Sequence, residues 1–208
     1  MKKFIFLLLA FAAFHLNPTV FAETCSFKVD PHSIQVGWTA FKTMQKVGVN
    51  GTFTHVALTG VLEKKGSLSD LLQQLGALMD LKASTDLSTG NPARDQTLFD
   101  HFFKLFKKTA LIKGKIRNVK GSNSEGEFDL ELSMNQKTLA VPMRFTLSQE
   151  GKFEAKGGID VLDFNLKDAF HDLHQTCEVL HKGTDGVSKT WPTVDLKLSA
   201  TIAQKCSS

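Results

Sequence analysis

Three histidines cluster in the C-terminal part of the chain, and they are the first residues to consider for chemistry. His171, His174 and His181 could supply imidazole nitrogens to a metal ion, with Asp172 or Glu178 as a carboxylate ligand. Their spacing is not the His-Glu-x-x-His arrangement of the zinc proteases, and the sequence shows no matched cysteine or glutamate ligand elsewhere. Histidines on the solvated face of a helix are a commoner reason for such a cluster. We therefore expect no metal site.

The sequence also offers little to nucleophilic catalysis. It contains no Gly-x-Ser-x-Gly elbow. A pair of Cys177 with His174 or His181 would sit within one helix, where the imidazole is poorly oriented to act as a base. Arg94 and Asp95 could act on a substrate as a charge pair, but a pair that fixes its own loop is the simpler explanation. We expect a protein that is not an enzyme and that uses no cofactor.

The first residues have the form of a signal peptide. Lys2 and Lys3 give a charged start, residues 4–14 are apolar, and the small residue Ala22 suits signal peptidase. A membrane anchor is the alternative, but the apolar run falls well below the roughly 20 residues that span a bilayer. We expect cleavage after Ala22, which removes residues 1–22. The product is then a periplasmic or secreted protein with no stable membrane anchor.

The remaining residues, 23–208, have the length of a single domain. Removing Lys2 and Lys3 from the 25 Lys and Arg residues leaves 23, scattered among 21 Asp and Glu residues. This balance argues against nucleic-acid binding, which rewards clustered basic residues. The chain contains 17 Phe, two Trp and no Tyr. Purely apolar rings suit a dry cavity better than a wet binding surface.

Apolar and polar residues alternate along most of this domain, which is the period of a β-strand with one apolar face. The alternation is clearest over residues 128–134, 139–147, 153–161 and 194–202, opens at 34–38, and is weaker over 49–62, 78–85 and 109–119. The pattern predicts about eight strands. Short turn sequences join neighbours, so consecutive strands should pair antiparallel. Such strands could stack as a sandwich or close into a barrel, and the patterning alone does not choose between them.

Three segments break this period and are predicted to be helical. Leucines recur over residues 68–78, after the good N-cap Ser67. A longer apolar stripe runs over residues 166–180 and is opened by Asn165. Residues 94–106 carry apolar side chains four apart. The predicted fold class is therefore all-β with short helices.

Several motifs resemble the YceI family. They are Asp30-Pro31-His32-Ser33, Gly51-Thr52-Phe53 and, most specifically, Thr89-Gly90-Asn91-Pro92-Ala93-Arg94-Asp95-Gln96-Thr97-Leu98 followed by Phe102-Phe103. The resemblance covers most of residues 25–204. It implies an exported, lipocalin-like, eight-stranded antiparallel up-and-down barrel that encloses a long apolar ligand, and so favours the barrel over the sandwich. Members of that family are often dimers, so the resemblance also implies a homodimer.

Two features depart from the family pattern. Gln136 stands in a turn where the family commonly places a glycine. The stretch 164–190 forms a helical insertion between the last two strands and is longer than the resemblance leads us to expect. If this insertion covers one mouth of the barrel, it alters the size or class of ligand that can enter.

The barrel that the resemblance implies bears on the three cysteines, Cys25, Cys177 and Cys206, which allow three pairings in an exported protein. In a closed barrel of eight strands, the start of the first strand and the end of the last are antiparallel neighbours at one rim. Cys25 and Cys206 fall there, whereas Cys177 lies on the connection at the opposite rim. We expect a Cys25–Cys206 disulfide, with Cys177 as a buried free thiol.

These expectations support the sequestration of an apolar lipid: a polyisoprenoid, an isoprenoid quinone or a fatty-acid-like molecule. The inward residues predicted to line the cavity are Val36, Trp38, Phe53, Leu81, Phe103, Phe128, Leu130, Met143, Phe145 and Leu198. Each ligand methylene buried among them would contribute roughly 0.8 kcal/mol. Two alternatives stay open. One is a secreted stress or interaction protein whose barrel is filled by its own side chains, and the other is a histidine-dependent metal enzyme.

Overall fold

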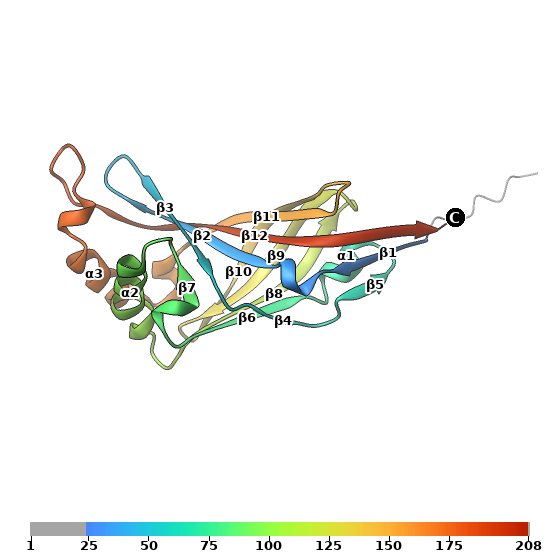
Figure 1. The fold of residues 1–208 in the computed structure, drawn as a ribbon, viewed down its shortest axis with the longest axis horizontal. Coiled ribbons are helices and arrows are strands. Elements are labelled where there is room, and N and C mark those ends of the chain that lie inside the picture. Colours follow the sequence, from blue (N-terminus) through green and yellow to red (C-terminus); the bar gives the residue numbers. More distant parts are fainter. Residues whose placement is uncertain (1–23, 208) are drawn as a thin grey trace, which may run out of the picture.

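The structure, a computed structural model, describes residues 24–207. The expected signal peptide, residues 1–22, lies outside this range. The described residues form an antiparallel sheet that curls into a half-barrel, with helices at both of its ends (Figure 1). In this part of the chain, no helix is long and apolar enough to cross a bilayer.

The sheet contains twelve strands, and each hydrogen-bonded pair is antiparallel. They are β1 (Thr24–Val29), β2 (Gln35–Lys42), β3 (Val47–Phe53), β4 (Ala57–Thr59), β5 (Glu63–Lys65), β6 (Gly76–Leu81), β7 (Leu87–Ser88), β8 (Ala110–Gly121), β9 (Glu125–Met134), β10 (Lys137–Leu147), β11 (Lys152–Asp160) and β12 (Thr190–Ser207). Their order is β4-β6-β8-β9-β10-β11-β12-β2-β3-β7, and β1 pairs with both β12 and β5.

The barrel-like antiparallel sheet expected from the sequence is confirmed, with more strands than predicted. Each of the predicted segments contains at least one strand, and the added strands β1, β5 and β7 are short. The predicted segment 49–62 divides into two strands, because β3 pairs with β2 and β7 whereas β4 pairs with β6. This division allows one stretch of chain to contribute strands at or next to both edges of the curled sheet.

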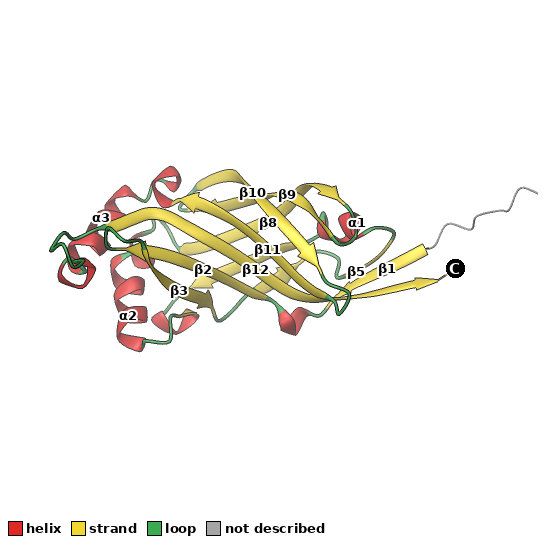
Figure 2. Cartoon of the chain, turned by 90° about the horizontal axis from the view of Figure 1, so that it is seen from above, coloured by secondary structure: helices red, strands yellow, loops and turns green. Residues whose placement is uncertain are grey.

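Helices lie at the two ends of the sheet (Figure 2). Helix α1 (Leu68–Leu72) lies at the end where β1 and β5 are found, whereas α2 (Pro92–His101) and α3 (Lys167–Thr176) lie together at the other end. Helix α1 is shorter than predicted, since Leu78 belongs to β6 and pairs with strands on both sides. A leucine-rich run fits the helical and the strand period alike, and the pairing of β6 with β4 and β8 decides for the strand.

Helix α3 lies in the expected insertion between the last two strands, β11 and β12. Asn165 does not cap this helix. Its φ angle of 58° is left-handed, it closes the preceding 3₁₀ turn Val161–Phe164, and Leu166 takes the N-cap position. Gln136 is also left-handed, with a φ angle of 64°, in the tight turn between β9 and β10. Glycine adopts this conformation without strain, which explains its common use at that turn.

Strand β12 lies inside the sheet and not at an edge. Its first part pairs with β11 on one side and β2 on the other, and its last part pairs with β1. Cys25 and Cys206 face each other in the β1–β12 ladder and form the expected disulfide. Cys177 is a buried free cysteine. The disulfide therefore joins the first and last described strands.

Candidate functional site

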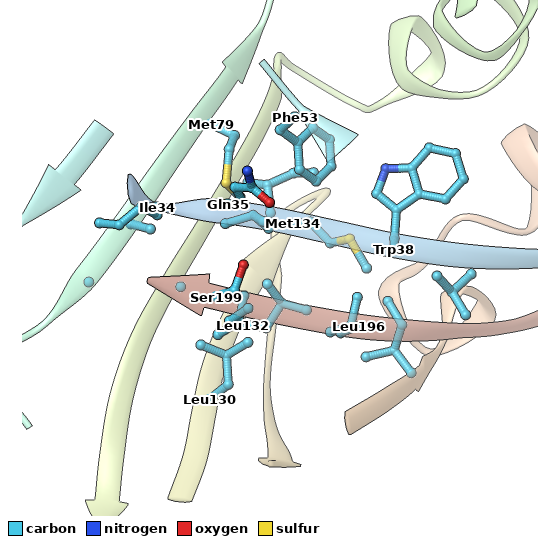
Figure 3. Close-up of a pocket in the computed structure, with 18 of the residues that line it drawn as sticks. Ile34, Gln35, Trp38, Phe53, Met79, Leu130, Leu132, Met134, Leu196 and Ser199 are labelled. Carbon is cyan, nitrogen blue, oxygen red and sulfur yellow. The ribbon is translucent and has the colours of Figure 1, made fainter. Parts of the chain in front are cut away.

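The concave side of the sheet encloses a cavity with a volume of about 220 Å³. Inward side chains of β2 and β12 form one wall, and those of β6, β8 and β9 form the other (Figure 3). An apolar cavity of about 150 Å³ in another protein stays dry and binds benzene. The space here is therefore sufficient for part of an apolar ligand.

Strand alternation delivers the lining residues to this cavity. Leu130, Leu132 and Met134 occupy every second position of β9, and Leu196 and Leu198 do the same on β12. Successive side chains of a strand point to opposite faces of the sheet, so the polar residues between them point away. The alternation in the sequence thus produces an apolar concave face.

Six of the ten residues that the sequence predicted to line the cavity do so, and four do not. Val36, Trp38, Phe53, Phe103, Leu130 and Leu198 border the cavity. Leu81, Phe128, Met143 and Phe145 are buried but do not border it. Phe128, Met143 and Phe145 belong to a packed core near α1, whereas Leu81 is buried at the other end of β6.

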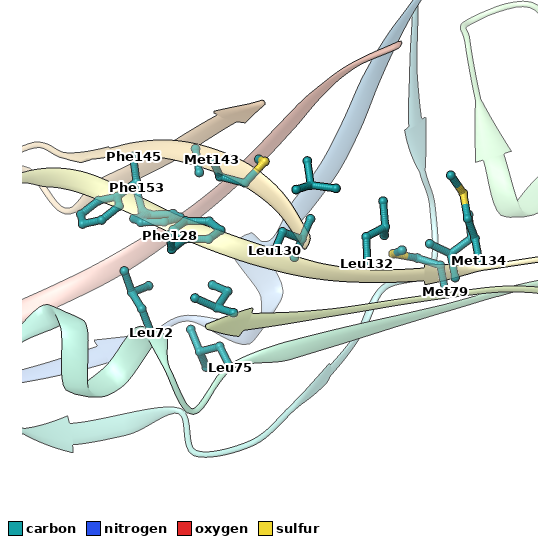
Figure 4. Packing of buried hydrophobic residues seen from close by; sticks show 14 of the residues in the cluster. Leu72, Leu75, Met79, Phe128, Leu130, Leu132, Met134, Met143, Phe145 and Phe153 are labelled. Atoms are coloured by element: carbon teal, nitrogen blue, oxygen red, sulfur yellow. The ribbon is translucent and has the colours of Figure 1, made fainter. Parts of the chain in front are cut away.

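The packed core fills the end of the half-barrel near α1 (Figure 4). Phe145 stacks between Phe128 and Phe153, with ring centroids 6.1 and 5.8 Å apart. Met143 lies opposite Phe128 in the β9–β10 ladder and therefore shares its layer. Leu81 is not part of this layer, since it ends β6 on the α2 side, where it lies opposite Ala110 at the start of β8. Aromatic rings from three strands fill this layer, and of the three only Phe153 borders the cavity.

Helices cover the opposite end of the cavity. Helix α2 and the 3₁₀ turn Phe103–Leu105 contribute Leu98, Phe102 and Phe103 to the lining, and α3 contributes Phe170 and Leu173. The rings of Phe102 and Phe103 meet edge to face, with centroids 5.2 Å apart. The helical insertion therefore forms part of the cavity wall.

The long motif of the sequence analysis builds α2. Asn91 caps the helix by accepting a hydrogen bond from the Arg94 backbone N–H at 3.1 Å. Asp95 is buried and accepts from both the backbone N–H and the hydroxyl of Thr89, at 2.8 and 2.6 Å. Among residues 24–207, Arg94 forms no ion pair with Asp95. Asn91 and Asp95 therefore fix this loop without an ion pair to Arg94, and with it the helix that covers the cavity.

A buried asparagine fixes the start of the insertion. The side-chain amide of Asn135, in the β9–β10 turn, donates to the carbonyl oxygens of Phe164 and Asn165 at 3.0 and 2.9 Å. Its oxygen accepts from the Lys107 backbone N–H at 2.8 Å. One side chain thus ties together the turn, the segment before β8 and the residues that lead into α3.

The two tryptophans of the chain both border the cavity, but their polar atoms differ. Trp191 donates from Nε1 to the Thr43 carbonyl oxygen at 2.7 Å. Trp38 is only 9% exposed, and within the described residues its Nε1 has no hydrogen-bond partner. Figure 3 shows this nitrogen on the side of the ring that faces the other labelled cavity residues. Its ring lies over Gly51 of β3, where any Cβ would clash with the indole.

The histidines near α3 take part in a local hydrogen-bond cluster. The Nδ1 atoms of His174 and His181 lie 2.9 and 2.6 Å from the Thr190 hydroxyl. Burial, followed by the charges of Lys42 and His174, lowers the pKa of His181 to about 4. Burial raises the pKa of the Cys177 thiol, which keeps it protonated. Across residues 24–207, no three or more His, Cys, Asp and Glu side chains group together to hold a metal ion.

The fold has counterparts among known proteins. A family model described as the YceI-like domain matches residues 27–202. The chain belongs to the YceI-like family. None of the curated proteins matches this YceI-like chain.

Two solved structures are similar to it. One is a polyisoprenoid binding domain from Saccharophagus degradans implicated in plant cell wall breakdown. It has 10% identity and a TM-score of 0.54, over 86% of this chain and 98% of that chain. The other is the YceI protein of Campylobacter jejuni. It has 17% identity and a TM-score of 0.46, over 79% of this chain and 90% of that chain. At such identities, the likeness to the first structure shows the fold alone.

Sequence reasoning missed several cavity residues. Leu132, Met134 and Leu196 share the inward face of residues that were predicted, so the alternation could have identified them. Trp191 lies before the predicted strand 194–202, and no periodic signal marks it. Phe170 was assigned to a helical stripe, whose contact with the cavity depends on where α3 packs.

Proposed function

We propose that this protein is an exported binding protein that encloses a long apolar ligand, of the polyisoprenoid, isoprenoid quinone or fatty-acid class. The observation that carries the proposal is the cavity between the curled sheet and helices α2 and α3, with its almost wholly apolar lining. Apolar ligand surface that leaves water gains roughly 25 cal/mol per Å². The Saccharophagus degradans domain, which is described as polyisoprenoid binding, has the same fold and supports an isoprenoid ligand.

The buried Trp38 nitrogen adds a polar requirement to this ligand. An unpaired N–H in an apolar site costs about 1–3 kcal/mol. The nitrogen has less than 1 Å² of accessible surface, so the indole must shift for a ligand oxygen to reach it and recover this cost. The donor of Trp191 is already used by Thr43. A ligand with one acceptor oxygen and a long hydrocarbon chain therefore fits better than a pure hydrocarbon.

The residues that border the cavity favour binding over catalysis. Within the described part of the chain, none of them is an Asp, Glu, His, Cys, Lys or Arg. Acid–base catalysis mostly uses these side chains, within hydrogen-bond reach of the reacting atoms. Nucleophilic catalysis also uses Ser and Thr hydroxyls, and Thr190 and Ser199 are the two hydroxyl residues in the lining. The function that this lining supports is sequestration or transport of the ligand.

Native mass spectrometry tests the proposal directly. The full-length sequence is expressed in cells that can export and process it, and the purified protein is weighed before and after organic extraction. We expect the mass of residues 23–208 with a stoichiometric adduct that extraction releases and lipid analysis identifies. A bare protein that takes up neither isoprenoids nor fatty acids contradicts the proposal and favours the self-filled barrel.

Matched variants locate the ligand. Leu196→Asp puts a charge into the cavity wall, whereas Thr201→Asp puts the same charge on the outer face of the same strand, β12. Only the first should lose the adduct. Ala40→Phe fills the cavity without a charge and should reduce uptake as well. Full ligand content in folded Leu196→Asp and Ala40→Phe proteins would place the ligand elsewhere.

A further inference from the structure

Large apolar side chains that face solvent gather at the end of the molecule where α3 lies. Of the eight such residues among 24–207, five are here: Met44 and Val47 beside the β2–β3 turn, and Val179, Leu180 and Val187 between α3 and β12. Val179 is 76% exposed and Leu180 is 70% exposed. Singly scattered apolar residues are normal on a protein surface, but a cluster indicates an interaction site. We call these five residues the apolar tip.

The two segments that supply the apolar tip form a single surface. The Thr43 backbone N–H donates to the Lys189 carbonyl oxygen at 2.8 Å, and Trp191 donates back to the Thr43 carbonyl oxygen. Lys42 Nζ donates to the Leu180 carbonyl oxygen at 3.3 Å. These bonds hold the β2–β3 turn against the segment that follows α3. Figure 1 shows both loops on the same side of α3, at the end of the molecule opposite β1.

Basic residues surround the apolar tip. Lys42, Lys46, Lys182 and Lys189 lie in the two segments, which contain only two acidic residues, Glu178 and Asp185. The ammonium groups of Lys46 and Lys189 lie 4.4 and 5.0 Å from the centre of the Trp191 ring. The end of the molecule thus combines exposed apolar side chains, a tryptophan and an excess of positive charge.

The apolar tip also adjoins the cavity. Thr190 and Trp191 border the cavity, and Trp191 bonds the turn that carries Met44. Phe170 and Leu173 of α3, the helix that precedes Val179, border the same space. A ligand that enters or leaves at this end therefore passes beside the tip.

We propose that the apolar tip docks on a bilayer that contains anionic lipids, with its apolar side chains in the interface and its lysines among the headgroups. Peripheral proteins bind membranes through this combination of buried apolar area and electrostatic attraction, and tryptophan is favoured at the interface. Apolar side chains alone would suit a second copy of the chain equally well. The lysines around them favour an anionic surface. Docking itself stands on these residues alone, whereas a role in loading lipid rests on the proposed function.

Two matched valines provide the central test. Val47 of the tip and Val61, in the β4–β5 connection, are both 48% exposed. The protein is expressed from the full-length sequence, and an intact mass confirms that the apolar residues 4–14 are absent, since they would bind vesicles themselves. Binding is measured by sedimentation with vesicles of phosphatidylcholine, with and without phosphatidylglycerol. We expect Val47→Asp to weaken binding at least about fivefold, from the lost insertion of half a valine side chain, and Val61→Asp to leave it unchanged.

Charge gives a second, independent readout. We expect stronger binding to vesicles with phosphatidylglycerol, and a decrease as salt is raised. Lys182→Gln should weaken binding to these vesicles about fivefold and leave binding to phosphatidylcholine alone unchanged. Val179→Asp combined with Leu180→Asp should weaken binding on the order of a hundredfold, because both side chains are mostly exposed.

Three results would overturn the inference. The first is that the protein binds neither kind of vesicle. The second is that Val47→Asp and Val61→Asp weaken vesicle binding equally. The third is that the protein forms a dimer which Val47→Asp dissociates, with no binding to vesicles. The last would make the tip an interface between copies. Ligand supplied from detergent solution separates this test from the proposed function, because Val47→Asp should still take it up. Vesicle binding without ligand uptake would refute the proposed function and leave the docking surface standing.

Discussion

Replacing Trp38 by Phe tests whether the unpaired indole nitrogen recognises a ligand oxygen. Phenylalanine keeps an aromatic ring over Gly51 and removes the only polar atom of the side chain. The free protein loses an unsatisfied donor, which offsets part of the loss from the smaller ring, so the variant should fold. A neutral hydrogen bond contributes about 0.5–1.5 kcal/mol net, which corresponds to a factor of about two to ten in affinity.

The assay compares two ligands and two variants by calorimetry. A polyprenol offers one oxygen, and the hydrocarbon of the same chain length offers none. We expect Trp38→Phe to weaken the polyprenol about twofold to tenfold more than the hydrocarbon. Trp191→Phe is the matched control: Trp191 also borders the cavity, but its donor is already bonded to Thr43, so both ligands should change equally. Equal weakening of both ligands by Trp38→Phe would refute the reasoning.

Three further changes have expected outcomes that thermal or urea unfolding can check. Gly51→Ala should lower the free energy of unfolding by about 1–3 kcal/mol, because a Cβ at this position overlaps the Trp38 ring. The same substitution made in the Trp38→Phe variant should cost less, which would confirm the contact. No change in stability for Gly51→Ala alone would contradict it. Asn135→Ala should cost about 2–4 kcal/mol, because it leaves buried backbone groups unpaired, and should increase hydrogen exchange at the start of the insertion; unchanged exchange would exclude the anchoring role. The folded pKa of His181, about 4, lies below its ordinary value, so its neutral form stabilises the protein above about pH 6.5, and this stability is lost as pH falls toward 4. In His181→Asn, the fall in the free energy of unfolding between about pH 6.5 and 4 should be smaller by on the order of 1 kcal/mol, after allowance for solvent screening. Identical pH profiles of stability for the two proteins would show that His181 does not titrate in this way.

Period-two patterning located the strands, because a sheet with one apolar face must alternate along the sequence. It could not separate Phe128 from Leu130, which lie on the same face of β9 only two positions apart. Phe128 stacks on Phe145 of β10, which stacks in turn on Phe153 of β11, whereas Leu130 borders the cavity. Whether a layer is filled or hollow depends on side chains from distant strands, and no local pattern reports it.

Local signals were also insufficient at the ends of elements. Leu78 suited a helix as well as a strand, and its partners on β4 and β8 decided the outcome. The disulfide was predictable, because barrel topology places Cys25 and Cys206 together whatever the side chains between them. The apolar tip was not, because its two segments are far apart in the sequence and each carries only a few apolar residues.

The position of β12 has a consequence for how the protein is made. This strand, the last of the described chain, joins β11 to β2 and so connects the two halves of the sheet. Until β12 is synthesised, β2 and β11 expose unpaired edges that can add strands from other molecules. A chain cut before Thr190 would lose the 18 residues of β12 from the middle of the sheet. Three separate pieces of sheet would remain, β4 to β11, β2-β3-β7 and β1-β5, instead of a trimmed barrel. Assembly of the sheet therefore depends on the last strand of the described residues.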